Sequence, residues 1–365
     1  MKKILLYTAF LSLSLTASAQ GLKDVLGKYF LVGAAINSEQ AKGLDSLQTQ
    51  VITRNFNSIV AEDCMKPESV QPKEGKFRWR QADRFVQFGE QHQMTIIGHC
   101  LVWHSQTKEW MFKDSLGNTA SRELLIQRMK THIQTVVGRY KGRIKGWDVC
   151  NEVVLDNGNF RPSPWYQIIG PDYIELAYRF AHEADPDAEL YYNDYSLANP
   201  TKRAAVCQLI RNLKAKGCRI DAIGMQSHNG MDFPNLKEYE ASIDSFAACG
   251  VKVMVTELDM NVLPNPESFS GAEVSQHFEY TEAMDPYKNG LDKKTEELIN
   301  KRWLALFQIY HRHRHQISRV ATWGVSDRDS WMNNWPIPGR TAYPLLFDRE
   351  YRQKPIVRDI LKIFK

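Results

Sequence analysis

Two glutamates lie where they could carry out acid–base and nucleophilic chemistry together. Glu152 lies near the end of the apolar run IKGWDVCNEV at residues 144–153, and Glu257 lies within VKVMVTELDM at residues 251–260. A single carboxylate at such a place is often only a salt-bridge partner. Two suit glycoside hydrolysis, in which one carboxylic acid protonates the leaving oxygen and the other carboxylate attacks the anomeric carbon or activates water.

The neighbours of the two glutamates suggest different roles. Asp259 follows Glu257 by two positions, and His228 ends the preceding run at residues 220–228. A histidine held between two carboxylates can hydrogen-bond Glu257 and keep it ionised, as a nucleophile requires. Glu152 follows Asn151 and has apolar neighbours, and burial there favours the protonated form that a general acid needs.

Tryptophans supply the other half of a sugar site. The chain has nine, and Trp103, Trp323 and Trp331 fall at or just after the ends of strand-like runs. Indole rings stack on the apolar faces of pyranose rings, while polar neighbours bind the hydroxyl groups. Trp79 and Trp147 are instead expected in the core.

The elements that must position these residues form one repeating pattern. Short apolar runs alternate with amphipathic segments such as Ala204–Gly217, and continuous β-branched runs indicate parallel strands buried on both faces. The eight runs cover residues 29–37, 57–63, 94–103, 144–153, 189–196, 220–228, 251–260 and 319–327. This predicts an α/β fold, a single (β/α)8 TIM barrel at residues 20–365 with enlarged βα loops and its active site at the carboxyl ends of the strands. The gap of roughly 60 residues between the last two runs predicts a long loop before the last helix.

Residues 1–19 have the features of a signal peptide. Lys2 and Lys3 precede an apolar run, and Ala17-Ser18-Ala19 offers a cleavage site after Ala19. We expect an exported protein, periplasmic or secreted. No later apolar stretch is long enough to predict a membrane span. The near balance of 47 basic and 42 acidic residues argues against a nucleic-acid partner, and we expect a monomer.

Cysteine and histidine usage points to neither a disulfide framework nor a metal site. The six cysteines are widely spaced without a CxxC pair, so we expect most to be free buried thiols. The tract from His311 to His315 is interpreted as a solvated helix end. A GxSxG motif and a phosphate-binding glycine loop are both absent from the sequence, and we expect no cofactor and no metal.

Five motifs resemble one known family closely. GHCLVWHSQ (98–106), WDVCNEV (147–153), YYNDY (191–195), VTELDM (255–260) and TWGVSDRDSW (322–331) are similar, in order and spacing, to those of glycoside hydrolase family 10, the retaining endo-β-1,4-xylanases. The resemblance covers nearly the whole chain after residue 19. It implies a TIM barrel that hydrolyses internal bonds of xylan and binds xylooligosaccharides.

The resemblance also implies roles for individual residues. Glu152 would be the acid/base, Glu257 the nucleophile, and Asn151 the ligand of the sugar's 2-hydroxyl. His228 would orient Glu257, with Asp259 behind it. The substrate-binding residues would be His99, Trp103, Gln226 and Trp323 around the reacting sugar, Glu62, Lys66, Gln106 and Trp331 on the glycone side, and Asn193 and Tyr195 on the leaving-group side.

The chain departs from the family pattern at two places. Asp63 follows Glu62 where the family usually has asparagine, so an amide donor on the glycone side is missing. The strand before Trp323 reads ATWGVSD, where the family often has a second aromatic residue. Neither change affects Glu152 or Glu257.

Two alternatives stay open from the sequence. The substrate could be another β-1,4-glycan, cellulose or mixed-linkage glucan, because the sequence does not decide whether the site accepts a hydroxymethyl group. The barrel could also bind glycans without cleaving them, although binding alone does not require a buried carboxylic acid.

Overall fold

Eight parallel strands form a closed barrel in a computed structural model that describes residues 20–269 and 273–365. The strand order is sequential, and pairing of β1 with β9 and of β6 with β8 closes the ring. The barrel strands are β1 (Leu31–Ile36), β2 (Ser58–Ala61), β3 (Thr95–Trp103), β4 (Gly146–Asn151), β5 (Glu189–Asp194), β6 (Ala222–Met225), β8 (Lys252–Asn261) and β9 (Ile317–Thr322). The predicted (β/α)8 barrel is therefore confirmed.

One predicted strand is divided in two. The run at residues 220–228 forms β6 and a separate short strand, β7 (His228–Gly230), which pairs with the outer part of β8. The chain bends at Ser227, whose φ is 65°. His228 therefore begins a strand beside Asp259 instead of ending β6.

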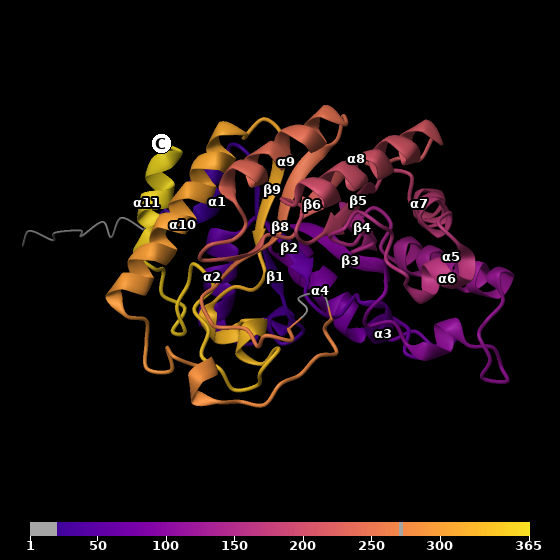
Figure 1. Cartoon of the computed structure of the whole chain (residues 1–365), viewed down its shortest axis with the longest axis horizontal. Coiled ribbons are helices and arrows are strands. Elements are labelled where there is room, and N and C mark those ends of the chain that lie inside the picture. The colour runs from indigo at the N-terminus through magenta and orange to yellow at the C-terminus, as the bar shows by residue number, and fades with distance from the viewer. Residues whose placement is uncertain (1–19, 270–272) are drawn as a thin grey trace, which may run out of the picture.

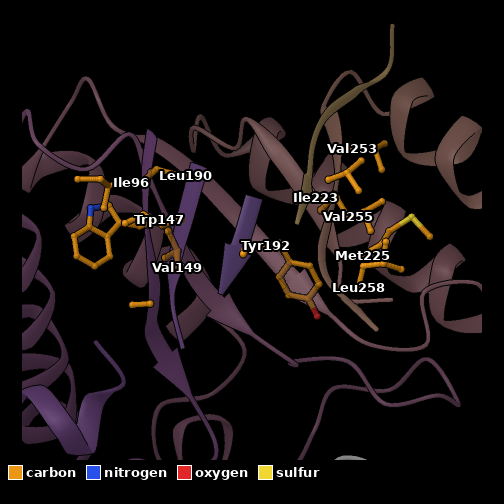
Figure 2. Packing of buried hydrophobic residues seen from close by; sticks show 14 of the residues in the cluster. Ile96, Trp147, Val149, Leu190, Tyr192, Ile223, Met225, Val253, Val255 and Leu258 are labelled. Carbon is orange, nitrogen blue, oxygen red and sulfur yellow. The ribbon is translucent and has the colours of Figure 1, made fainter. Parts of the chain in front are cut away.

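Alternating side chains explain why the strands are rich in apolar residues on both faces. Leu190 and Tyr192 of β5 belong to the large outer core, part of which Figure 2 shows, whereas Tyr191 belongs to a smaller cluster. In β8, Val253 and Val255 belong to the outer core and Met254 to the smaller cluster. Successive residues of a strand point to opposite faces, so a strand between barrel interior and helices is buried on both.

Helices surround the strands (Figure 1). The described helices are α1 (Leu22–Leu26), α2 (Ser46–Asn55), α3 (Pro67–Val70), α4 (Arg80–Gln91), α5 (Arg122–Arg139), α6 (Pro164–Ile169), α7 (Tyr173–Ala184), α8 (Pro200–Ala215), α9 (Leu236–Ala248), α10 (Lys293–Arg312) and α11 (Ile356–Ile363). The helix expected from Ala204 starts earlier, at Pro200. The side chain of Asn199 caps it by accepting hydrogen bonds from the backbone N–H groups of Thr201 and Lys202.

The predicted long loop lies between β8 and α10 and forms the orange connection at the lower edge of Figure 1. Its described part contains one short 3-10 helix, Glu282–Met284. Two side chains after β9 attach to it. Trp335 Nε1 donates a hydrogen bond of 3.0 Å to the carbonyl of Val274, and Arg340 donates one of 3.0 Å to the carbonyl of Pro264.

Of the two tryptophans expected in the core, Trp147 is buried, whereas Trp79 is only partly buried against the core and stacks on Phe77. Trp147 is fully buried and lies against Gly98, where an added Cβ would come within 2.1 Å of the indole ring. All six cysteines are buried and unpaired. Within the described ranges, no helix combines the length and apolar character needed to cross a membrane. The predicted signal peptide lies outside the described residues.

Candidate active site

Glu257 lies on β8 with both carboxylate oxygens hydrogen-bonded. Oε1 accepts a hydrogen bond of 2.7 Å from Nδ2 of Asn193, and Oε2 lies 3.1 Å from Nε2 of His228. Burial by itself raises the pKa of this carboxyl, but the hydrogen bond from His228 and the charge of His99 outweigh burial, so the pKa is lowered below its ordinary value. Glu257 is thus held as an anion, the state in which a carboxylate can attack carbon.

His228 connects Glu257 to a second buried carboxylate. Its Nδ1 lies 2.9 Å from Oδ2 of Asp259, which also accepts a hydrogen bond of 2.9 Å from Nε1 of Trp331. Burial lowers the pKa of His228, but Asp259 and then Glu257 raise it to about 10. An imidazolium donates from both ring nitrogens, so His228 can hydrogen-bond both carboxylates at neutral pH.

Glu152 comes directly after β4 in a different environment. Oε2 accepts a hydrogen bond of 2.9 Å from Nε1 of Trp103, and Oε1 accepts one of 2.9 Å from Nε2 of Gln226. The backbone of Glu152 has a φ of 59°, in the left-handed region, and its carbonyl accepts a hydrogen bond from Arg161. This unusual conformation turns the chain sharply at the mouth of the barrel.

An amide network joins the environments of the two glutamates. Nδ2 of Asn193 donates both to Glu257 and, at 2.9 Å, to Oδ1 of Asn151, while Oδ1 of Asn193 accepts from Thr256 at 2.6 Å. Asn193 is fully buried and is not part of the cavity lining. Its expected contact with substrate on the leaving-group side is therefore corrected, because its side chain is used to position Glu257 and Asn151.

A cavity of about 800 Å³ opens over these residues. Asp259, like Asn193, lies behind its wall, since it is fully buried. The structure brings the remaining predicted site residues together around this cavity: Glu62, Lys66, His99, Trp103, Gln106, Asn151, Glu152, Tyr195, Gln226, His228, Glu257, Trp323 and Trp331.

The wall formed after β2 and β3 carries charged groups. The Lys66 Nζ lies 5.4 Å from the ring centre of Trp103. Burial raises the pKa of Glu62 to about 7, with Lys66 opposing the rise and Asp63 adding to it. Oδ1 of Asp63 accepts a hydrogen bond of 2.9 Å from Oγ of Ser38, so the departure from the family pattern has a defined partner.

The opposite wall carries Tyr195, just after β5. The Tyr195 hydroxyl accepts a hydrogen bond of 2.8 Å from Arg161, and the Nζ of Lys202 lies 3.4 Å from the ring centre. Lys202 is fully buried and forms an ion pair of 2.8 Å with Asp194. Burial, opposed by Lys202, raises the pKa of Asp194 to about 6. Buried Lys202 therefore packs against the ring of Tyr195 and fixes its position.

Several aromatic residues that line the cavity were not predicted from the sequence. Trp335 stacks on Trp331 with ring centres 5.0 Å apart, and Phe269 packs edge-on against Trp335. Trp335 could have been noticed, because it follows Trp331 in the segment WMNNWP. Phe233 and Phe269 lie in loop sequences that give no comparable signal.

The histidine tract lies elsewhere. His311 is on the last turn of α10 and packs edge-on against Phe364, with ring centres 5.0 Å apart. His313 lies 2.9 Å from a carboxylate oxygen of Glu240.

Comparison with known proteins places this geometry in a family. The model of Glycosyl hydrolase family 10 matches residues 21–363. The chain belongs to glycosyl hydrolase family 10. It is 57% identical over 344 residues to Endo-1,4-beta-xylanase A of Xylanibacter ruminicola, with 94% of this chain and 93% of that protein aligned. It is 39% identical over 345 residues to Exoglucanase XynX of Acetivibrio thermocellus, which matches over 92% of this chain and 28% of that protein.

Solved structures of family 10 enzymes share the fold. The structure of a novel GH10 endoxylanase retrieved from sugarcane soil metagenome superposes with a TM-score of 0.90 at 44% identity. The superposition covers 94% of this chain and 100% of that chain. The family assignment made from the five motifs is confirmed, and the chain is a glycoside hydrolase.

Proposed function

We propose that the protein is an endo-1,4-β-xylanase that works with retention of configuration. The match to the family and to a xylanase over nearly the whole chain supports activity on xylan, and the observation that carries the assignment of roles is the difference between the two carboxylates. Glu257 is bonded to the cationic His228, whereas Glu152 accepts hydrogen bonds from the neutral side chains of Trp103 and Gln226. A charged partner favours a carboxylate nucleophile, and neutral partners are compatible with a carboxylic acid that donates a proton.

The reaction then has two steps. Glu257 attacks the anomeric carbon while Glu152 protonates the glycosidic oxygen, so that the carbon–oxygen bond breaks and a glycosyl-enzyme forms. Glu152, now a carboxylate, takes a proton from water, which attacks the same carbon and releases Glu257. Asn151 faces the cavity beside Glu152 and can hydrogen-bond the 2-hydroxyl of the reacting sugar.

Proton NMR of the first products from xylohexaose tests the mechanism. Retention predicts that the β-anomer accumulates first and then mutarotates. Early accumulation of the α-anomer would show single-step inversion and would overturn the role given to Glu257.

A second candidate substrate is a β-1,4-glucan, favoured by the similarity to a protein named an exoglucanase. Parallel rates on xylan and carboxymethylcellulose distinguish the two, because a glucan adds a hydroxymethyl group to every sugar. The similarity to Endo-1,4-beta-xylanase A is higher and covers nearly all of that protein, so we expect xylan to be the better substrate.

The proposed function also includes export of the protein and a monomeric state. The amino-terminal sequence supports cleavage after Ala19, and a processed protein beginning at Gln20 is the expected result of amino-terminal sequencing. Light scattering of the purified protein tests the expected monomer.

A further inference from the structure

Arg319 of β9 is a buried cation without a protein partner. It is 1% exposed, and among the described residues none hydrogen-bonds its Nε, Nη1 or Nη2. At Arg302, Arg340 and Arg349 only Nε is buried in this state. A buried guanidinium without hydrogen bonds is strongly disfavoured, so something other than these side chains must satisfy Arg319.

The guanidinium lies inside the barrel and below the catalytic cavity. The next residue, Val320, belongs to the outer core, so Arg319 points to the opposite face, which is the barrel interior. In the register of the strands Arg319 pairs with Met254, which precedes Glu257 by three positions on β8. Arg319 is therefore closer to the amino-terminal end of the barrel than Glu257 and is not part of the cavity lining.

Asp148 of β4 is a buried carboxylate that faces the same interior. Its neighbours Trp147 and Val149 belong to the outer core (Figure 2), so Asp148 points inward. Its Oδ2 lies 2.9 Å from Nδ1 of His99, whereas no described residue hydrogen-bonds its Oδ1. Burial lowers the pKa of Arg319, and the charge of Asp148 is the first to oppose this effect. Two unsatisfied groups of opposite charge thus act on one another inside the barrel.

Water is the ligand whose chemistry suits both groups. An anion would satisfy the guanidinium of Arg319 but would be repelled by Asp148, and a cation would have the reverse difficulty. A water molecule accepts a hydrogen bond from the one and donates to the other. Ser58 of β2 offers a third polar group, because its buried Oγ has no partner in the described ranges and it lies on the same strand face as Val60 of the interior cluster.

His99 connects this interior pair to the reacting carboxylate. Burial raises the pKa of Glu257, but the hydrogen bond from His228 and then the charge of His99 lower it. The ring of His99 lines the cavity, and its Nδ1 is held by Asp148. A cation that stabilises the Asp148 carboxylate therefore favours the charge and the orientation of His99.

We propose that Arg319 is a positioning residue for the reaction: water molecules inside the barrel join its guanidinium to Asp148, which in turn holds the His99 ring in the cavity wall. This inference rests on the proposed role of Glu257 as the nucleophile. Arg319 does not touch the substrate. Removing its charge makes the interior more negative and the Glu257 anion less stable.

Other titratable groups surround the pair and stay unchanged in the test. Those that interact with Asp148 or Arg319 are His99 and Cys100 on β3, Tyr178 on α7, Glu189 and Tyr191 on β5, and Glu257 on β8. Glu257 itself faces His228, with Asp259 behind it. A change in the pH profile that depends on the charge at position 319 can therefore be assigned to Arg319.

Two replacements separate the charge of Arg319 from its packing. Arg319→Gln keeps hydrogen-bonding groups but loses the charge, whereas Arg319→Lys keeps the charge. We expect Arg319→Gln to move the acidic limb of kcat/KM on an aryl β-xylobioside upward by about 0.5 to 1 pH unit, and Arg319→Lys to stay near the wild-type profile. Arg302→Gln, at a half-buried arginine of α10, is the matched control and should leave the limb in place.

Asp148→Asn tests the route of the effect. In this background the carboxylate that links Arg319 to His99 is neutral, so adding Arg319→Gln should move the acidic limb less than it does in the wild type. An equal shift in both backgrounds would show that Arg319 acts on Glu257 without Asp148, and would overturn the inference. An unmoved limb in Arg319→Gln, or the same shift in Arg319→Gln and Arg319→Lys, would also overturn it.

A high-resolution crystal structure of the wild-type protein decides the matter even if the variants do not fold. It should show ordered water within about 3.2 Å of both a guanidinium nitrogen of Arg319 and Oδ1 of Asp148. A direct ion pair between the two side chains, or an interior without water between them, would overturn the bridge. Failure of the wild-type protein to cleave both xylan and the aryl xylobioside would instead overturn the proposed function.

Discussion

Nε2 of His228 lies 3.1 Å from Oε2 of Glu257, while the other ring nitrogen of the same histidine is bonded to Asp259. Glu257 thus has a cation as a direct partner at the centre of the barrel mouth. Because Asp259 holds the ring from behind, the imidazole cannot turn away from Glu257 without losing a buried hydrogen bond.

The pH profile should depend on this pair. The pKa of Glu257 is lowered from its ordinary value of 4.5, so the acidic limb of kcat/KM should lie below that pH. Replacing the imidazolium in His228→Gln should raise the pKa and move the acidic limb upward. The loss of activity should then be larger at about pH 5 than at about pH 7. His315→Gln, at an exposed histidine, serves as the control and should leave the acidic limb unchanged. If the acidic limb does not move in His228→Gln, the effect of His228 on the pKa of Glu257 is contradicted.

The two glutamates should respond differently to a small external nucleophile. Glu257→Ala should lower kcat on xylan by on the order of 10⁴- to 10⁶-fold, and added azide should give the α-xylosyl azide by direct attack. Glu152→Ala should still form the glycosyl-enzyme from a substrate with a good aryl leaving group. Azide should then give the β-product. NMR of the xylosyl azide products distinguishes the two anomers. If Glu257→Ala gave the β-azide and Glu152→Ala the α-azide, the roles of the two glutamates would be exchanged.

Asp63 offers a test on the glycone wall. Asp63→Asn keeps the oxygen that accepts from Ser38, restores an amide donor and removes a charge that raises the pKa of Glu62. We expect KM for xylotriose to fall by about two- to tenfold, the worth of one hydrogen bond, with little change in kcat. Ser38→Ala is the control for a general disturbance of this wall. An unchanged or higher KM in Asp63→Asn would show that the carboxylate is as good a ligand as the amide.

Lys202 should matter for stability more than an ordinary lysine does. In Lys202→Met, Asp194 loses its buried partner, and we expect the free energy of unfolding to fall by about 3–5 kcal/mol. The double variant Lys202→Met/Asp194→Asn removes both charges and should recover part of the loss. Urea unfolding curves measure both effects. Equal losses in the single and double variants would show that the unpaired charge is not the cause.

Reducing agents should leave the stability unchanged, because the six cysteines are buried and unpaired. Melting temperatures with and without dithiothreitol provide the check. A native disulfide would show itself as a loss of about 2–5 kcal/mol on reduction.

The strands and the reacting residues could be predicted because both leave local signals. β1 is an uninterrupted apolar run, and β8 starts as one after Lys252. Glu257 interrupts β8, and Glu152 directly follows β4, at places where a buried strand would otherwise stay apolar. The barrel rule then places their side chains at one mouth without any knowledge of distances. The division between β6 and β7 escaped prediction because it depends on pairing of β7 with β8.

Contacts between distant loops could not be predicted. The burial of Lys202 depends on Asp194 and Tyr195, which lie on another element, so the sequence shows only a lysine near the start of a helix. Asn193 was expected to contact substrate because it lies near the end of a strand, yet Glu257, Asn151 and Thr256 together use its whole amide. The exposure of Phe233 depends on the path of the loop between β7 and α9. A loop sequence has no helical or strand periodicity from which the exposed positions could be predicted.

The pairing of β1 with β9 has a consequence for synthesis of the chain. The first strand finds its second neighbour only near the other end of the sequence, at residues 317–322. On the ribosome, the ring therefore stays open until translation is almost complete, with one edge of β1 and the growing edge of the sheet both unpaired. Such edges attract other strands, so the nascent protein depends on rapid late closure, or on a chaperone, to avoid aggregation.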